Sequence, residues 1–395
     1  MTISTRIRDQ IDKRAVGSNS LTFIDRLMPT PLRPLEVRSG VSADPVLTRR
    51  PLVSVIIPCF NYGRFLEASV GSCRSQRGVD VEIIIVDDAS TDDSAAVAAG
   101  LADRDARVRV IRNATNQNHV RTFNNGYAVA SGEFIVRLDA DDLLTPGSLA
   151  RAVALFDGYP SVGLVYGNPR HFETAEPPRP QTSGRLTWTI WAGQQWLAER
   201  CRVGVNCITT PEAVVRASTM ADVGPLRTEL RFAQDMELWV RLSAVSDVGR
   251  VNGADQALHR DHAASMSETE GAGILTDLRE RREVFRVSFG LVGDRIEDSA
   301  QLSDLATRTL AREALSHACH ALDRGRATPE QTAAYVDFAR ETLPQWEDLP
   351  EARGLRRRLR IGAGRVQRHP VYVTRSATDG IRGNLQHVRW RTRGI

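Results

Sequence analysis

The sequence has few of the features that would assign it at once to a secreted or membrane-bound class. No apolar run approaches the roughly 20 residues that cross a bilayer, which excludes an integral membrane protein. The amino terminus carries charges of both signs and no apolar segment behind them, so we do not expect a signal peptide. There is no Cys-x-x-Cys pair, and the five cysteines predict reduced thiols in a cytoplasmic protein, not disulfides or a zinc site. They are Cys59, Cys73, Cys201, Cys207 and Cys319.

Lysine is almost absent: Lys13 is the only lysine among 52 basic residues. The net charge of +4 conceals an uneven distribution of charge along the chain. Residues 1–50 carry +4, residues 351–395 carry twelve arginines and +10, and the part between them carries −10. Such a basic block faces solvent, contacts anionic lipid at about 1 kcal/mol per basic residue, or binds nucleic acid. The acidic body and the few aromatic residues of the tail disfavour nucleic acid. We expect peripheral contact with the inner face of a membrane.

The length of 395 residues and the apolar content of 42 % suit one large domain with appendages and exclude a wholly disordered chain. Residues 1–50, rich in proline and arginine, are predicted to form an N-terminal arm. Residues 51–270 are predicted to form the main domain, residues 271–350 a helical C-terminal region, and residues 351–395 an arginine-rich tail. Thr328 is expected to cap a helix in the helical region.

Short apolar runs alternate with helical patterns after residue 51, which predicts an α/β fold with a mostly parallel central sheet. Ser90 or Thr91 is expected to cap the second helix, and Thr145 with Pro146 to open the fourth. Ligands of such sheets bind at the carboxyl ends of the strands. The expected strands are 53–58, 81–86, 108–111, 134–138 and 162–166.

Acidic residues follow several of these strands. Asp139-Ala140-Asp141 has the spacing in which two carboxylates on one turn hold a hard divalent cation, Mg²⁺ or Mn²⁺. Such a cation binds diphosphate oxygens and stabilises a leaving group as a Lewis acid. Acidic residues at strand ends also cap helices, and we assign that role to Asp92 and Asp93. The alternative is weaker for Asp139, Asp141 and Asp142, because Thr145 is the better expected cap.

Four segments, in this order and spacing, resemble family 2 glycosyltransferases with the GT-A fold and an inverting mechanism. They are VSVIIPCFNYGRFLEASVGSCRSQ, VEIIIVDDASTDDS, SGEFIVRLDADDLLTPGSL and AQDMELWVRL. The resemblance covers about residues 51–267, a little over half of the chain. It implies a GT-A domain over residues 51–270 with the helical region as an appendage.

The resemblance also implies which residues bind the nucleotide-sugar. The chain around Pro58, Phe60 and Asn61 would hold the nucleoside, with Asp88 at the pyrimidine edge and Asp87 supporting the turn. Asp139 would lie near the ribose and Asp141 on the metal, with Asp142 as a less certain neighbour.

Two further segments of the chain fit the family in part. Asn124 and Gly126 fit the donor-binding pattern, whereas a glycine expected near Asn118 is absent. In the segment His259–Ser267, Arg260 would lie near the diphosphate and His262 would be the third metal ligand. Exposed loop residues are the alternative interpretation of that segment.

Inverting transfer needs a base that takes a proton from the acceptor hydroxyl. The family places this base in an acidic pair before an apolar helix, which here reads Gln234-Asp235. Asp235 is the candidate, and the usual preceding glutamate is replaced by Gln234. Glu237 is the second candidate base, and a helix cap is the alternative role for Asp235. The tryptophans near residue 190 form an acceptor wall or pack in the core.

The predicted function is metal-dependent transfer of a sugar from a UDP-, GDP- or TDP-sugar to a saccharide or other glycoconjugate. A non-catalytic nucleotide-sugar-binding protein is the first alternative. A nucleotidyltransferase is the second, disfavoured because Pro58-Cys59-Phe60-Asn61 replaces the glycine-rich phosphate loop that it would need.

Overall fold

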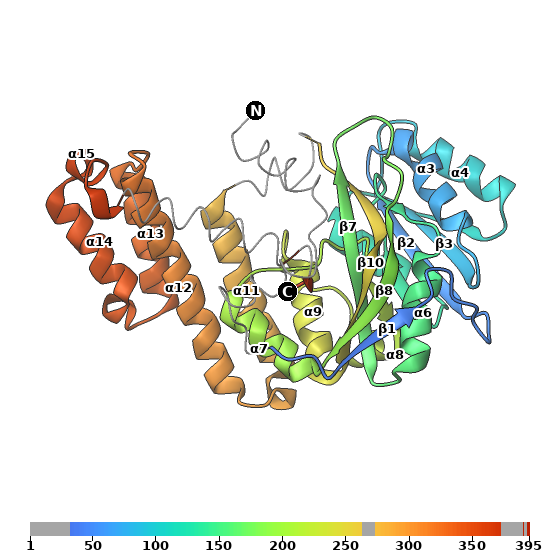
Figure 1. Ribbon diagram of the computed structural model, residues 1–395. Helices are drawn as coiled ribbons and strands as arrows, with labels where there is room; N and C mark the ends of the chain where they lie inside the picture. Colours follow the sequence, from blue (N-terminus) through green and yellow to red (C-terminus); the bar gives the residue numbers. More distant parts are fainter. Residues whose placement is uncertain (1–31, 263–272, 373–389, 391–392) are drawn as a thin grey trace.

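The computed structural model describes residues 32–262, 273–372, 390 and 393–395. Within these residues the strands form one mixed sheet in the order β1-β8-β10-β7-β9-β5-β2-β3-β4, with β6 paired to β10. Helices cover both of its faces, and a helical arm extends from one side (Figure 1). The strands are β1 (Glu36–Val41), β2 (Leu52–Cys59), β3 (Asp80–Asp87), β4 (Val108–Arg112), β5 (Phe134–Arg137), β6 (Leu143–Leu144), β7 (Val162–Phe172), β8 (Thr182–Trp191), β9 (Val214–Arg216) and β10 (Asp247–Arg260).

The half of the sheet from β5 to β4 is parallel, as the sequence predicts. Its central strand β2 is apolar on both faces because helices cover both. Val55 and Ile57 pack with α3, α4 and α6, whereas Ile56 packs with α5 on the other face. These helices are α3 (Gly63–Arg74), α4 (Ser94–Arg104), α5 (Asn118–Tyr127) and α6 (Ser148–Gly158).

The other half of the sheet is largely antiparallel, which the sequence analysis did not foresee. Strand β8 pairs antiparallel with β1 and β10, and β9 pairs antiparallel with β5 and β7. In β8, Leu186, Trp188 and Ile190 are buried while the threonines between them are half-buried, which is the alternation of a strand. The tryptophans Trp188, Trp191, Trp196 and Trp239 are all buried, so core packing is their role.

Two predicted helix starts are wrong. Helix α4 begins at Ser94, where Asp92 rather than Ser90 or Thr91 accepts a hydrogen bond from the Ser94 amide (2.9 Å). Helix α6 begins at Ser148 after Gly147, because the Thr145 hydroxyl donates instead to the Asp255 carbonyl on β10. The predicted cap Thr328 is confirmed, since its hydroxyl accepts from the amide of Gln331 (3.1 Å).

The helical C-terminal region shares a core with the sheet domain. Helix α9 packs on the sheet through Leu238 and Leu242 and on the helical region through Met236 and Val240. Both sides of α9 are therefore fixed, which matters because this helix carries Asp235. The remaining helices are α7 (Gly193–Val203), α8 (Ala217–Val223), α9 (Gln234–Val245), α11 (Ile274–Val292), α12 (Ser299–Asp323), α13 (Pro329–Thr342), α14 (Pro350–Ile361) and α15 (Ala363–Val366).

The last residues of the chain return to the sheet domain. The indole of Trp390 donates to the Cys207 carbonyl (2.8 Å), and the buried Tyr166 hydroxyl donates to the Gly394 carbonyl (2.7 Å). At the other end of the predicted tail, α14 packs on α12, and the guanidinium of Arg358 binds Asp323 (2.7 and 2.8 Å). None of the helices in the described ranges is long and apolar enough to cross a membrane.

Candidate active site

The loops that follow β2 and β3 contact each other at the carboxyl edge of the sheet. Asn61, with a left-handed φ of 59°, accepts hydrogen bonds from the Thr91 amide (2.8 Å) and hydroxyl (3.2 Å). Asp88 is buried and accepts from the Asn113 amide group (2.7 Å) and the Gln117 backbone (2.8 Å). The edge is thus built from side chains that bind the neighbouring loop.

The other two expected nucleoside contacts and Asp87 lie at the same edge. Pro58 is buried at the end of β2, in register with Val86 of β3, whereas Phe60 is 42 % exposed. Asp87 is buried, accepts from the Ser90 amide (3.3 Å) and pairs with Arg112 (3.3 Å). Asp87 therefore supports the turn after β3, and Phe60 is open to a ligand.

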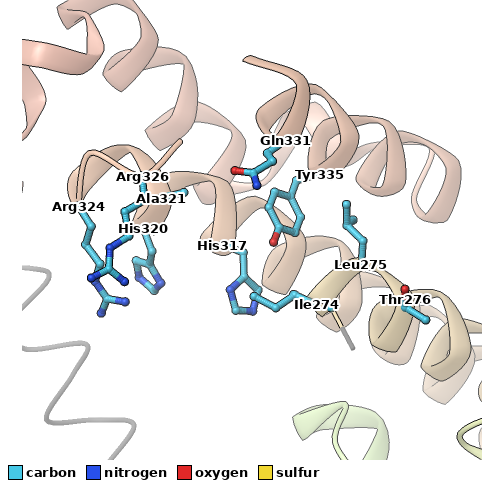
Figure 2. A pocket seen from close by; sticks show the side chains of 11 residues that line it. Ile274, Leu275, Thr276, His317, His320, Ala321, Arg324, Arg326, Gln331 and Tyr335 are labelled. Carbon is cyan, nitrogen blue, oxygen red and sulfur yellow. The ribbon is translucent and has the colours of Figure 1, made fainter. Parts of the chain in front are cut away.

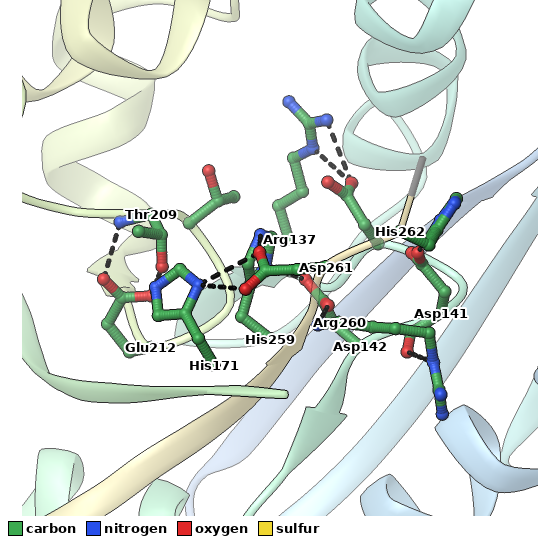
Figure 3. A network of polar contacts seen from close by, with 12 residues as sticks. Arg137, Asp141, Asp142, His171, Thr209, Glu212, His259, Arg260, Asp261 and His262 are labelled. Atoms are coloured by element: carbon green, nitrogen blue, oxygen red, sulfur yellow. Dashed lines mark hydrogen bonds and ion pairs between the residues drawn. The ribbon is translucent and has the colours of Figure 1, made fainter. Parts of the chain in front are cut away.

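The Asp139-Ala140-Asp141 segment follows β5, and its carboxylates have different partners. Asp139 pairs with Arg137 (2.9 Å), and Asp141 lies 2.9 Å from Nε2 of His262. The next residue, Asp142, is buried, binds Nδ1 of His259 (2.9 Å) and accepts from the amide of Arg260 (2.9 Å). Figure 3 shows that His262 and Asp141 lie together, with Asp142 and His259 beside them.

Burial and mutual repulsion set the charge of these carboxylates. Burial, together with the neighbouring Asp142 and Asp139, raises the pKa of Asp141 to about 6. Burial also raises the pKa of Asp142, although His259 opposes it. Burial acts in the same direction on Asp139, but Arg137 and His119 outweigh it and the pKa of Asp139 is lowered. A cation between Asp139 and Asp141 would relieve this repulsion.

The donor set fits a divalent metal. Asp141 offers a carboxylate oxygen and His262 an imidazole nitrogen that face each other, and both side chains are mostly buried, with 13 % and 21 % of their surface exposed. Oxygen with one nitrogen suits Mn²⁺ and, through the carboxylate, Mg²⁺. Asp141 and His262 are therefore the two residues that would hold it.

Arg260 and Tyr62 flank this pair. The guanidinium of Arg260 lies over the rings of Phe65 (4.9 Å) and Phe172 (4.4 Å) and donates to the Asp141 carbonyl (3.3 Å). The hydroxyl of Tyr62 lies 3.2 Å from Nε2 of His262, and burial raises the pKa of Tyr62 to about 12. Sequence reasoning missed Tyr62, because only its contact with a residue 200 positions away gives it a role.

Asp235 lies in the first turn of α9, as predicted. Its Oδ2 accepts from the Asn206 amide group (2.9 Å) and the Thr210 hydroxyl (3.4 Å), and burial raises its pKa. Glu237 is fully buried and binds Arg241 with both oxygens (2.6 and 2.8 Å). Both oxygens of Glu237 are therefore engaged by Arg241, whereas Asp235 stays the candidate base.

Gln234 links the start of α9 to the Asp139 carboxylate. Oriented so that both ends of its amide are satisfied, its oxygen accepts from Arg137 (2.9 Å) and from Nε2 of His119 (3.1 Å). Arg137 in turn binds Asp139 (2.9 Å). Burial, followed by the charge of Arg137, lowers the pKa of His119 to about 4. Sequence reasoning missed Arg137 and His119, which have no motif of their own.

Both ends of the Asn124 side-chain amide are bound within the protein. Its amide group donates to the Leu226 carbonyl (2.8 Å), and its oxygen accepts from the Leu226 amide (3.1 Å). Both ends therefore tie α5 to the segment before α9, and a donor contact by this side chain has no support in the geometry.

A hollow of about 430 Å³ lies away from the strand ends, between α11, α12 and α13 (Figure 2). Its lining includes His317, His320, Arg324 and Arg326 and no carboxylate. It is a basic depression separate from the acidic edge.

Known proteins resemble the part of the chain that builds this edge. The family described as "Glycosyl transferase family 2" matches residues 54–210. An uncharacterized protein of Mycobacterium tuberculosis is 31 % identical over 260 residues, which cover 64 % of this chain and 79 % of that protein. The chain belongs to glycosyl transferase family 2. The predicted family is thereby confirmed.

One further relative in sequence and one solved structure resemble this glycosyltransferase. The O-antigen biosynthesis protein RfbC of Myxococcus xanthus is 30 % identical over 251 residues, covering 62 % of this chain and 18 % of RfbC. Crystalline TarS 1-349 of S. aureus, in complex with UDP-GlcNAc, superposes with a TM-score of 0.55 at 15 % identity, covering 80 % of this chain and 90 % of TarS 1-349. The predicted GT-A fold with a helical C-terminal region is confirmed, with a mixed sheet.

Proposed function

We propose that this family 2 glycosyltransferase moves a sugar, with inversion, from a nucleotide-sugar donor to a hydroxyl group of a saccharide or other glycoconjugate. The observation that carries the proposal is the chain of contacts from Asp139 through Arg137 to Gln234, beside Asp235. This chain of contacts joins the metal-binding edge and the candidate base in one polar network. A non-catalytic sugar-nucleotide binder has no need of a partly buried base at that place.

The donor would lie along the edge formed by β2, β3 and β5. Asp88 at the end of β3 and the backbone from Pro58 to Asn61, with Phe60, would hold the nucleoside, and Asp139 would hold the ribose. Asp141 and His262 would hold Mg²⁺ or Mn²⁺, which supplies Lewis-acid stabilisation of the leaving diphosphate. Arg260 lies next to Asp141 and would add a fixed positive charge to the same diphosphate.

Asp235 would take the proton of the acceptor hydroxyl. Its raised pKa brings a carboxylate closer to the basicity that proton abstraction needs near neutral pH. Asn206 and Thr210 both donate to Oδ2 and so hold the carboxylate in place. Because α9 is packed from both sides, this carboxylate has a fixed direction.

The similar proteins indicate which classes of donor and acceptor to test. TarS was crystallised with UDP-GlcNAc, so a UDP-sugar is the first donor to test, followed by GDP- and TDP-sugars. RfbC is named for O-antigen biosynthesis, which supports a polysaccharide or glycoconjugate acceptor. Ligand binding to the folded state raises the melting temperature, so a thermal-shift screen with and without Mn²⁺ identifies the donor.

The decisive experiment is Asp235→Asn, assayed with the donor found in this screen. We expect turnover to fall by about 10²- to 10⁴-fold, the usual contribution of a general base, while donor affinity stays within about twofold. Asp337→Asn, in an exposed ion pair on α13, is the matched control and should keep full turnover. Full turnover by Asp235→Asn would remove this residue as the base. Donor binding without any turnover in the wild-type chain would instead favour a non-catalytic binding protein.

A further inference from the structure

Two histidines and an aspartate lie together at the ends of β7 and β10, beside the carboxylate edge (Figure 3). His171 and His259 are paired in the parallel register of these strands, and their rings are 4.9 Å apart at 72°. Nδ1 of His171 lies 3.1 Å from both oxygens of Asp261, and Nε2 of His259 lies 3.8 Å from one of them. The three side chains thus turn a nitrogen, a nitrogen and an oxygen toward one point, within 4.8 Å of one another.

We propose that His171, His259 and Asp261 form a second metal site, which binds a divalent ion of the zinc class independently of the donor. It differs from the Asp141–His262 pair in its ligands and in its place on the sheet. Asp261 turns to His171 on β7, whereas the next residue, His262, turns to Asp141 after β5. The site goes beyond the proposed transfer reaction, which does not require it.

The spacing of the ligand atoms suits such an ion. Zn²⁺ binds nitrogen and oxygen ligands at about 2.0–2.2 Å, so tetrahedral ligand atoms lie roughly 3.3–3.5 Å apart. The separations of 3.1 and 3.8 Å lie on either side of this value. Binding therefore needs shifts of only a few tenths of an ångström in these two contacts. Two imidazoles and one carboxylate favour Zn²⁺ and similar transition metals over Mg²⁺ or Ca²⁺, which prefer all-oxygen sites.

The surroundings already orient the ligands. Asp142 is buried and binds Nδ1 of His259 (2.9 Å), which leaves Nε2 directed at the cluster, the arrangement in which a carboxylate orients a metal-binding histidine. The backbone amide of Asp261 donates to the Phe172 carbonyl (2.9 Å), which fixes Asp261 next to His171. His171 and His259 lie on paired strands, and a backbone hydrogen bond holds Asp261 beside them. Sites built on strands are positioned more precisely than sites built on loops.

The cluster is also open to solvent. The side chains of His171, His259 and Asp261 are 32 %, 28 % and 44 % exposed, so an ion can enter and water can complete its coordination. A bound ion would join the end of β7 to the segment that carries Arg260 and His262. The ion would therefore restrict the movement of the two residues that are proposed to hold the diphosphate and its cation.

The test uses the full chain with Asp141→Asn as background, so that the donor-site metal does not contribute. After equilibrium dialysis at a fixed low concentration of free Zn²⁺, we expect one Zn²⁺ per chain in Asp141→Asn and none in Asp141→Asn/His171→Gln. Asp141→Asn/His317→Gln makes the same change at a histidine of α12 and should keep one Zn²⁺. Zn²⁺, but not Mg²⁺ at the same concentration, should raise the melting temperature of the variants that keep the ion.

Equal Zn²⁺ content with and without His171 would overturn the proposal, as would a folded Asp141→Asn chain that retains no Zn²⁺. Asp261→Asn is a second variant, needed in case His171→Gln does not fold. It replaces the carboxylate with an amide of the same shape, and it should also lose the ion. Circular dichroism establishes that each variant is folded. None of these readouts depends on sugar transfer, so they stand whether or not the proposed reaction is correct.

Discussion

The acidic edge of the sheet and the helical side of the molecule differ in the side chains that contact their buried carboxylates. At the edge, Asp141 faces His262 and Asp142 faces His259, while Arg137 and Arg112 each contact a single oxygen of Asp139 and Asp87. On the helical side, the buried carboxylate of Glu237 is bound by both arms of Arg241, and that of Asp323 by both arms of Arg358. An arginine is permanently charged and matches a carboxylate with two parallel hydrogen bonds, so such a pair is closed to other partners.

A carboxylate that faces histidine can still bind a metal ion. A neutral imidazole presents a lone pair that binds metal, and it can release the carboxylate to a cation. A buried carboxylate bound through both oxygens by arginine therefore serves stability, whereas a carboxylate that faces histidine stays open to a ligand. Each of the following predictions changes one side of this comparison.

Arg241→Met should cause the largest loss of stability. It leaves Glu237 fully buried without its cation, and breaking a buried pair in this way costs about 3–5 kcal/mol. Urea unfolding followed by circular dichroism measures the change. Arg340→Met, in the exposed pair with Asp337, should cost less than about 1 kcal/mol. Similar losses in the two variants would contradict the distinction between buried and exposed pairs.

Asp141→Asn should uncouple donor binding from the metal. Changes to residues that only support metal ligands weaken metal binding by about 10- to 100-fold, and loss of a ligand should do at least as much. Calorimetric titration of the donor with Mn²⁺ and with EDTA measures this. The wild-type chain should lose donor affinity in EDTA, whereas Asp141→Asn should bind equally weakly in both. A metal effect that persists in Asp141→Asn would place the ion elsewhere.

Gln234→Glu restores the acidic pair typical of the family and should change His119. In the wild type, burial and Arg137 lower the pKa of this imidazole to about 4. A carboxylate that accepts from Nε2 favours the protonated ring, so the pKa should rise. An NMR titration of His119 measures it. Gln331→Glu, at the exposed start of α13, should leave the pKa of His119 where it is.

Tyr62→Phe should have the smallest effect. It removes one hydroxyl 3.2 Å from His262, and a hydrogen bond of this kind contributes about 1 kcal/mol, or roughly fivefold in Mn²⁺ affinity. Tyr335→Phe, on α13, should leave that affinity unchanged. A loss well above tenfold in Tyr62→Phe would mean that Tyr62 itself is a ligand.

The sequence predicts the parallel half of the fold well, because each strand there is a short apolar run bounded by turns. It fails for β8, where the buried Trp188 and Ile190 alternate with half-buried threonines. From the sequence alone the role of this segment stays open, because a cluster of tryptophans suits sugar binding as well as core packing. The alternation itself was the available signal for a strand.

Some residues of the candidate site are predictable from the sequence, and others are not. Asp141, Asp235 and His262 are found from the sequence because each sits in a local pattern that resembles the family. Tyr62, Arg137 and His171 have no local pattern, and their roles come only from contacts with residues far along the chain. Such contacts depend on the pairing of β7 with β10 and on the packing of α9, which spacing does not reveal.

The chain between α14 and Trp390 is attached at both of its ends. Arg358 joins one end to α12, and Trp390 and Gly394 join the other to the sheet domain. Arg358, one of the twelve arginines of residues 351–395, is thus bound inside the helical region and does not face solvent. An anionic surface would have to compete with the buried Asp323 carboxylate for this arginine, so lipid binding through Arg358 would require that buried pair to open.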